Sequence, residues 1–237
     1  MNEKAAKLIK DRYTFDDLVE IMTLLRSEGG CPWDREQTHE SIRKKFIEET
    51  YEAVEAIDAR DYEHLKEELG DVMLQVVFHA QMENEVGRFD IDDVMTGVCS
   101  KLVVRHPHIF GDVTAETSEK VLLNWDEIKL KNRKAPKTVS TLDEVPRQLP
   151  ALMRSLKLVQ RAEKSGCVLP DTDECISATK TLMDSLFTAP KTEYEEIMGK
   201  VLLNLSIIAQ KMQIEPEEAL TKASDWFIID CKEGQAK

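Results

Sequence analysis

Apolar residues recur at helical spacing along most of the chain. In the segment 14–27 the apolar side chains fall three and four residues apart and form one stripe, made of Phe15, Leu18, Ile21, Met22 and Leu25. Thr14 precedes two acidic residues and is suited to cap the start of a helix. We therefore expect a helix over this segment.

The same periodicity continues through the rest of the first half. Further helices are expected over 41–58, 62–85, 90–105 and 118–131. The stretches 29–40 and 106–112 contain Gly and Pro and are expected to be loops. No window alternates with period two between turn signals, so no sheet is expected. The sequence predicts an all-α protein.

A basic stretch divides the chain. Residues 129–141 read KLKNRKAPKTVST, contain a proline and lack apolar periodicity. The 237 residues are enough for one or two domains. We expect a first helical domain over 1–134, a linker over 135–150 and a second helical unit over 151–237.

Composition and charge exclude several classes of protein. The chain has 45 acidic and 32 basic residues and a net charge of −13, which disfavours binding to nucleic acid or to an anionic membrane. Five cysteines without a C-x-x-C pair indicate neither a disulfide framework nor a zinc site. The N-terminus lacks the apolar core of a signal peptide, and no apolar stretch is long enough to cross a bilayer. We expect a cytoplasmic protein.

Acidic residues are concentrated on both sides of the turn between the two long helices. Residues 48–71 read EETYEAVEAIDARDYEHLKEELGD. Helical spacing places Glu48 and Glu52 on one face of the first helix, with Glu49 rotated by about 100° around the helix axis. On the second helix it places Glu68 and Asp71 on one face. A short turn makes the helices antiparallel neighbours, so these carboxylates are expected in one layer between apolar flanks.

Facing carboxylates repel one another, and burial increases the repulsion. A cation must therefore lie between them, or they must take up protons. Mg²⁺ prefers oxygen ligands and commonly binds a few carboxylates together with substrate phosphates. A solvated acidic face is the alternative. It explains the outer acids but not the five candidates, which have no opposed basic partners: Glu48, Glu49, Glu52, Glu68 and Asp71.

The pattern E-E-x-x-E, a spacer and then E-x-x-D resembles the motif of the all-α nucleoside triphosphate pyrophosphohydrolases. Flanking segments narrow the resemblance to the MazG family; they read GCPWDREQTHESI, EELGDVMLQVVFHAQ, RHPHIFGD and WDEIK. This resemblance implies a Mg²⁺-dependent enzyme, with Mn²⁺ as a substitute, that cleaves a nucleoside triphosphate into a monophosphate and pyrophosphate. It implies Glu49, Glu52, Glu68 and Asp71 as metal ligands, and Glu48 as the residue that orients or deprotonates the water.

The resemblance also indicates residues that contact the substrate. These are Lys101, Arg105, His106, Trp125 and Lys129. His106 could instead stabilise its loop, and Trp125 could instead pack its helix. The family usually carries two adjacent arginines before His-Pro-His, whereas this chain has Val104 at the first position. One expected phosphate contact is therefore missing.

The second half resembles a degenerate copy of the first. Residues 69–81, LGDVMLQVVFHAQ, align with residues 198–210, MGKVLLNLSIIAQ. This register places Ile197 against Glu68 and Lys200 against Asp71, and a lysine cannot replace a metal ligand. We expect the second unit to provide a scaffold or dimer interface.

Two further interpretations stay open. The chain could be a non-enzymatic, metal-stabilised helical interaction protein, or a hydrolase restricted to dUTP-like or modified nucleotides. Because a two-helix carboxylate pair is only half of a compact bundle, a homodimer is expected in either case.

Overall fold

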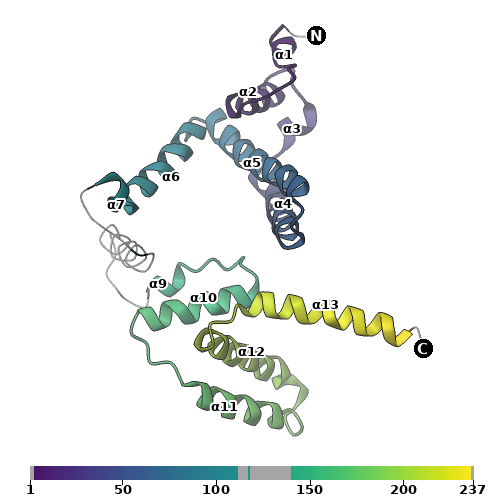
Figure 1. Cartoon of the computed structure of the whole chain (residues 1–237), viewed down its shortest axis with the longest axis vertical. Helices are drawn as coiled ribbons and strands as arrows, with labels where there is room; N and C mark the ends of the chain where they lie inside the picture. The colour runs from purple at the N-terminus through teal and green to yellow at the C-terminus, as the bar shows by residue number, and fades with distance from the viewer. Residues whose placement is uncertain (1–2, 112–116, 118–139, 236–237) are drawn as a thin grey trace. The chain divides into compact units, whose positions relative to one another are not determined.

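A computed structural model describes residues 3–111, 117 and 140–235, and within these ranges the chain is helical without a strand (Figure 1). The prediction of an all-α protein is confirmed. The chain divides into two compact units, Met1–Asn132 and Arg133–Lys237. No helix in the described ranges is both long and apolar enough to cross a membrane.

The described helices of the first unit are α1 (Glu3–Lys7), α2 (Phe15–Arg26), α3 (Pro32–Glu36), α4 (His39–Ala59), α5 (Tyr62–Glu85), α6 (Ile91–Arg105) and α7 (Pro107–Phe110). Those of the second unit are α9 (Ser140–Asp143), α10 (Ala151–Lys164), α11 (Thr172–Ser185), the 3-10 helix η1 (Lys191–Glu193), α12 (Tyr194–Lys211) and α13 (Pro216–Gln235).

The long helices α4 and α5 form an antiparallel pair because the sequence ends one and starts the other within two residues. Thr38 and Ser41 form a capping box at the start of α4. Arg60 adopts a left-handed conformation, with φ 56°, and its amide donates to carbonyls of the last turn of α4. Asp61 then caps α5 by accepting a hydrogen bond from the amide of His64. This tight reversal aligns the acidic segments of the two helices.

Helix α2 covers the far half of α5. Its capping box joins Thr14 and Asp17, and its apolar stripe enters a core made of Met22, Ile42, Val77, Phe78 and Met82. Arg26 closes this corner: its guanidinium binds both oxygens of Glu85 at 2.7 and 2.8 Å and donates to the carbonyls of Asp34 and Gln37. The register of α5 is thereby fixed.

Two predicted loops contain short helices instead. The segment 29–40 includes α3 and the first residues of α4, and the segment 106–112 includes α7. Pro32 and Pro107 each occupy the first turn of their helix. A proline there has its φ preset for a helix and loses no hydrogen bond, so it starts a helix rather than preventing one. The helix expected over 118–131 lies outside the described residues.

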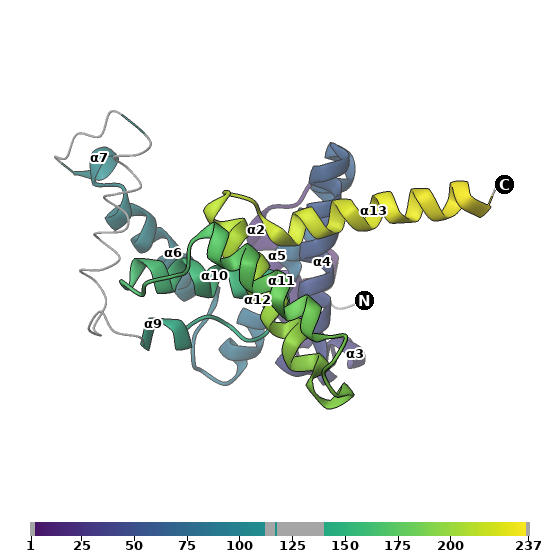
Figure 2. The same ribbon diagram turned by 90° about the horizontal axis from the view of Figure 1, so that it is seen from below.

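The second unit repeats the helix pairing of the first. Helix α12 packs against both α10 and α11, as α5 packs against α2 and α4, and its core contains Val159, Cys175 and Ile207. Helix α13 extends beyond α11 and α12 (Figures 1 and 2). The end of the segment expected to be a linker belongs to this unit, because it holds α9 and the buried Val145.

Candidate metal centre

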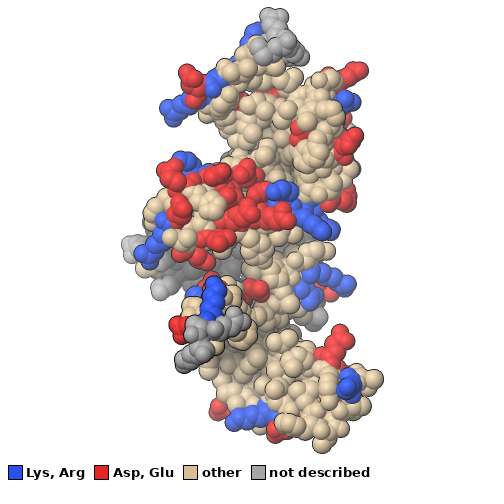
Figure 3. Space-filling view, turned by 90° about the vertical axis from the view of Figure 1, so that its right-hand side faces the viewer, with Lys and Arg blue, Asp and Glu red and all other residues tan. Residues whose placement is uncertain are grey.

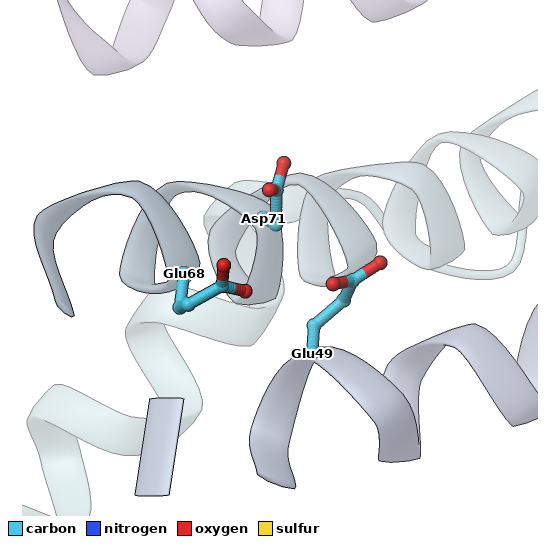
Figure 4. Close-up of side chains that lie close together, drawn as sticks. All are labelled: Glu49, Glu68 and Asp71. Atoms are coloured by element: carbon cyan, nitrogen blue, oxygen red, sulfur yellow. The ribbon is translucent and has the colours of Figure 1, made fainter. Parts of the chain in front are cut away.

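Three carboxylates converge between α4 and α5 (Figure 4). Glu49 projects from α4, and Glu68 and Asp71 project from α5. One oxygen from each residue lies within 4.8 Å of the other two. Glu49 and Glu68 are only 7% and 6% exposed, and Asp71 is partly buried. At about 4 Å, two unit charges repel by about 4 kcal/mol at an effective dielectric constant near 20, so the arrangement needs a compensating charge or proton.

Glu49 is buried because it lies on the stripe of α4 that packs against its neighbours. The buried residues of α4 are Ile42, Glu49, Ala53 and Ala56, at the spacing of seven, four and three that marks one helix face. The small side chains Ala53 and Ala56 leave room for close approach of α5. Glu68 lies in the same way on a stripe that continues through Gln75 and Phe78.

Each buried glutamate has a basic neighbour one turn earlier on its own helix. The ammonium of Lys45 lies 3.4 Å from Glu49 Oε1, and His64 Nε2 lies 2.9 Å from Glu68 Oε1. The other oxygen of Glu68, Oε2, is buried without a hydrogen-bond partner. A buried acceptor without a partner is costly, so this oxygen is available to a cation between the helices.

The electrostatics of the cluster favour added positive charge. Burial, followed by the charges of Glu49 and Glu68, raises the pKa of Asp71. A hydrogen bond with Glu49, together with burial and the charge of Glu68, raises the pKa of Glu52. Both carboxyl groups therefore hold protons more tightly than usual, and a divalent cation competes for the same oxygens.

Glu48 and Glu52 are placed differently from the three converging carboxylates. Glu48 has a side chain that is 57% exposed and faces Lys45 at 3.9 Å, while Glu52 is exposed beside Glu49. The apolar flank of α4 lies at the surface. Its side chains are exposed rather than packed against α5, and they are Ile47, Tyr51, Val54 and Ile57. The helix is rotated so that Glu49, not Glu48, faces α5.

The surface over the ends of α4 and α5 is strongly acidic. Figure 3 shows Asp and Glu side chains gathered in a band over the ends of α4 and α5, with a smaller basic group beside it. Local concentrations of one charge attract counter-ions. The band therefore favours cations over anions.

The candidate phosphate contacts lie on α6, which diverges from α4 and α5 (Figure 1). Lys101 is exposed and Arg105 is partly buried. Within the described ranges neither forms an ion pair with the clustered carboxylates. His106 ends α6, and its Nδ1 donates to the carbonyl of Leu102 at 2.6 Å. Trp125 and Lys129 lie outside the described residues.

The donor set fits a hard divalent cation. All three converging groups are carboxylates, which suit Mg²⁺, Mn²⁺ or Ca²⁺ and not a thiolate-seeking metal. In octahedral Mg²⁺ sites, opposite oxygens lie about 4.2 Å apart, so the observed spread of up to 4.8 Å closes with a small rotation of the side chains. The free Oε2 of Glu68 supplies a ready ligand.

No second cluster of this kind occurs in the described part of the chain. At the matching positions of α12, Ile197 is buried and Lys200 pairs with Glu196 at 2.5 Å. The second unit keeps the helix pairing and lacks the converging carboxylates there.

Sequence comparisons agree with this picture. Residues 37–110 match the MazG nucleotide pyrophosphohydrolase domain, and this range contains the whole carboxylate cluster. A nucleoside triphosphate pyrophosphohydrolase of Escherichia coli is 41% identical over 90% of this chain and 83% of its own length. A nucleoside triphosphate pyrophosphohydrolase/pyrophosphatase MazG of Thermotoga maritima is 39% identical over 90% of this chain and 82% of its own.

A third relative is longer than this chain. The protein YabN of Bacillus subtilis, described as uncharacterized, is 42% identical over 91% of this chain, which covers 45% of its length. The all-α fold and these matches define a nucleotide hydrolase of the helical pyrophosphohydrolase class. The chain belongs to the MazG nucleotide pyrophosphohydrolase family and is an enzyme of that class.

Proposed function

We propose that the protein hydrolyses nucleoside triphosphates to a nucleoside monophosphate and pyrophosphate with the help of Mg²⁺. The observation that carries the proposal is the convergence of Glu49, Glu68 and Asp71 within 4.8 Å, with one oxygen of Glu68 unpartnered. The printed activities of the relatives from Escherichia coli and Thermotoga maritima support the substrate class.

In this proposal Glu49, Glu68 and Asp71 hold the metal ion, and Glu52 completes the set from its position beside Glu49. When bound, Mg²⁺ supplies charge neutralisation at the phosphates and lowers the pKa of water. Glu48 lies outside the cluster with an exposed carboxylate, where it can accept a proton from the attacking water or orient it. Mn²⁺ is expected to substitute for Mg²⁺.

The substrate side of the site is proposed to include Lys101, Arg105 and His106, with Trp125 and Lys129. Within one chain α6 diverges from the carboxylates. Lys101, Arg105 and His106 would therefore reach the phosphates of a substrate at the carboxylates only if α6 comes from a second copy of the chain or changes its angle. We propose a homodimer. Apolar side chains on three helices of the first unit are exposed and suited to such an interface; they include Ile47, Val54, Leu69, Met73, Val98 and Leu102.

The interface is tested by measuring molar mass in solution for the parent and for Leu102→Asp. The parent is expected at twice the chain mass of 27.1 kDa, and the variant is expected to dissociate. A parent that is monomeric at enzyme concentrations used in assays would remove the dimer from the proposal.

The activity is tested by incubating the protein with a panel of nucleoside triphosphates, including dUTP and modified bases, with Mg²⁺ or with EDTA. Products are identified by chromatography. Monophosphate and pyrophosphate formed only with the metal support the proposal, and the panel measures base preference. Release of orthophosphate, or no turnover with any triphosphate, would contradict it.

A further inference from the structure

Lys45 occupies a particular place beside the carboxylate cluster. Its ammonium lies 3.4 Å from Glu49 Oε1 and 3.9 Å from Glu48 Oε2. Among the residues the structure describes, it is the one lysine or arginine that ion-pairs with a carboxylate assigned to the metal or to the water. The other basic neighbour, His64, contacts Glu68.

The pairing of Lys45 with Glu49 is asymmetric. The side chain of Lys45 is 61% exposed, whereas that of Glu49 is 9% exposed. Lysine carries its charge on a flexible four-carbon stem, so its ammonium can leave Glu49 without disturbing the core of α4. Glu49 is held between the helices and cannot follow. The lysine is therefore the movable partner.

The ammonium of Lys45 and a divalent cation would compete for the same carboxylate, that of Glu49. Two cations at one oxygen repel one another, so metal binding drives the ammonium outward. A triphosphate held at the same cluster by Mg²⁺ would bring negative charge within reach of the released ammonium. The phosphate candidates on α6 lie on a helix that diverges from the cluster, whereas Lys45 is already beside it.

We propose that Lys45 is an exchangeable counter-ion of this site: it neutralises Glu49 before metal binding and then binds the phosphate chain of the substrate. This proposal rests on the function proposed above. It assigns Lys45 a phosphate-binding role beside that of Arg105. The position before Arg105, where the family usually has a second arginine, is Val104 in this chain.

The proposal predicts opposite effects on two affinities. Lys45→Met keeps most of the apolar stem and removes the charge. It should tighten Mn²⁺ binding in the absence of nucleotide by about 15-fold, the effect of one unit charge on a divalent ion about 5 Å away at the dielectric constant of water. It should raise KM for the triphosphate by about tenfold, as expected for loss of one charged hydrogen bond. A merely structural residue would not shift the two affinities in opposite directions.

The experiment measures Mn²⁺ binding by titration calorimetry on the full chain without nucleotide, and KM and kcat with saturating Mg²⁺. The matched control is Lys66→Met, because Lys66 also pairs with a glutamate of its own helix, Glu63, three residues away, and both side chains are exposed. That control should leave both quantities unchanged. Lys45→Arg retains the charge and should keep the parental Mn²⁺ affinity.

Tighter Mn²⁺ binding together with a raised KM in Lys45→Met supports the exchange. Unchanged or weaker Mn²⁺ binding in a folded variant overturns it, as does an unchanged KM. Thermal melts in EDTA verify that each variant is folded. If the parent binds Mn²⁺ but hydrolyses no triphosphate, the proposed function fails, while the competition between Lys45 and the metal is still measured by calorimetry.

Discussion

Glu49 of α4 and Glu68 of α5 face one another across a helix interface, with carboxylate oxygens within 4.8 Å and less than a tenth of either residue exposed. Each is held by a basic side chain one turn earlier, Lys45 for Glu49 and His64 for Glu68. Buried like charges at this distance are destabilising unless a cation or proton intervenes. A cation bound between these two helices is therefore favoured.

The contrast between a buried and an exposed glutamate gives the first prediction. Glu68→Gln should abolish the stabilisation that Mg²⁺ gives to the fold, because Glu68 lies in the cluster. Glu48→Gln should retain it, because the carboxylate of Glu48 lies outside the cluster, and should lower kcat by about 10²–10⁴, the usual contribution of a positioned base. Thermal melts with and without Mg²⁺ and a turnover assay measure both. Equal loss of metal stabilisation in the two variants would contradict the assignment.

The second prediction concerns pH. Burial and the charges of Glu49 and Glu68 raise the pKa of Asp71. A raised carboxyl pKa contributes stability that is present below the ordinary value and is lost as the pH rises through the raised value. Asn at this position does not titrate. The stability of Asp71→Asn relative to the parent, measured in EDTA, should therefore increase with pH across this window. A difference that is constant or decreases with pH would show that the raised pKa is not coupled to folding.

A third prediction tests whether the contacts of Arg26 stabilise the packing of α5 against α2. Arg26→Ala removes two charged hydrogen bonds to Glu85 and leaves the carbonyls of Asp34 and Gln37 without this donor. The free energy of unfolding should fall by about 2–3 kcal/mol. Urea unfolding monitored by circular dichroism measures the change, and Lys66→Ala, in an exposed ion pair, should change it by less than about 0.5 kcal/mol. An Arg26→Ala value within that range would contradict the role given to Arg26.

The second unit provides the fourth prediction. Lys200 stands at the position that matches Asp71 and forms an exposed ion pair with Glu196. Lys200→Ala should leave kcat and KM within error, because the unit lacks converging carboxylates at the matching helix pair. A large loss of turnover in a folded variant would place the second unit in a working site.

Local signals in the sequence predicted much of the fold. The cap at Thr14, the turn at 59–61 and the acidic motif on 62–85 correspond to observed features, because each depends on residues within one or two turns of a helix. The short helices α3 and α7 are not evident from the sequence, because a proline marks a loop as well as the first turn of a helix.

Three of the residues predicted for the site lie together in the structure, Glu49, Glu68 and Asp71, but the orientation of α4 was not predicted. Helical periodicity places Glu48 and Glu52 on one face of α4 and Glu49 on an adjacent face. The rotation of α4, however, is set by the side chains that pack against α5. The spacing of Ile42, Glu49, Ala53 and Ala56 carries that information: the small alanines mark the close-packed side. Lys45 and His64 were missed, although a basic residue four positions before a glutamate is a visible signal. The relation of α6 to the carboxylates could not be predicted from periodicity, because it depends on packing between distant helices.

The central claim is that the buried carboxylates form a metal centre that drives hydrolysis, and one paired measurement on Asp71→Asn tests it. In EDTA the variant should melt at or above the parental temperature, because one repelling charge is gone. With Mg²⁺ at a hundredfold excess over its Kd, the parent should gain about 2.7 kcal/mol, or roughly 5–10 °C, while the variant gains much less and releases almost no pyrophosphate. A variant that melts like the parent under both conditions and still turns over would contradict the claim, as would one that unfolds in EDTA.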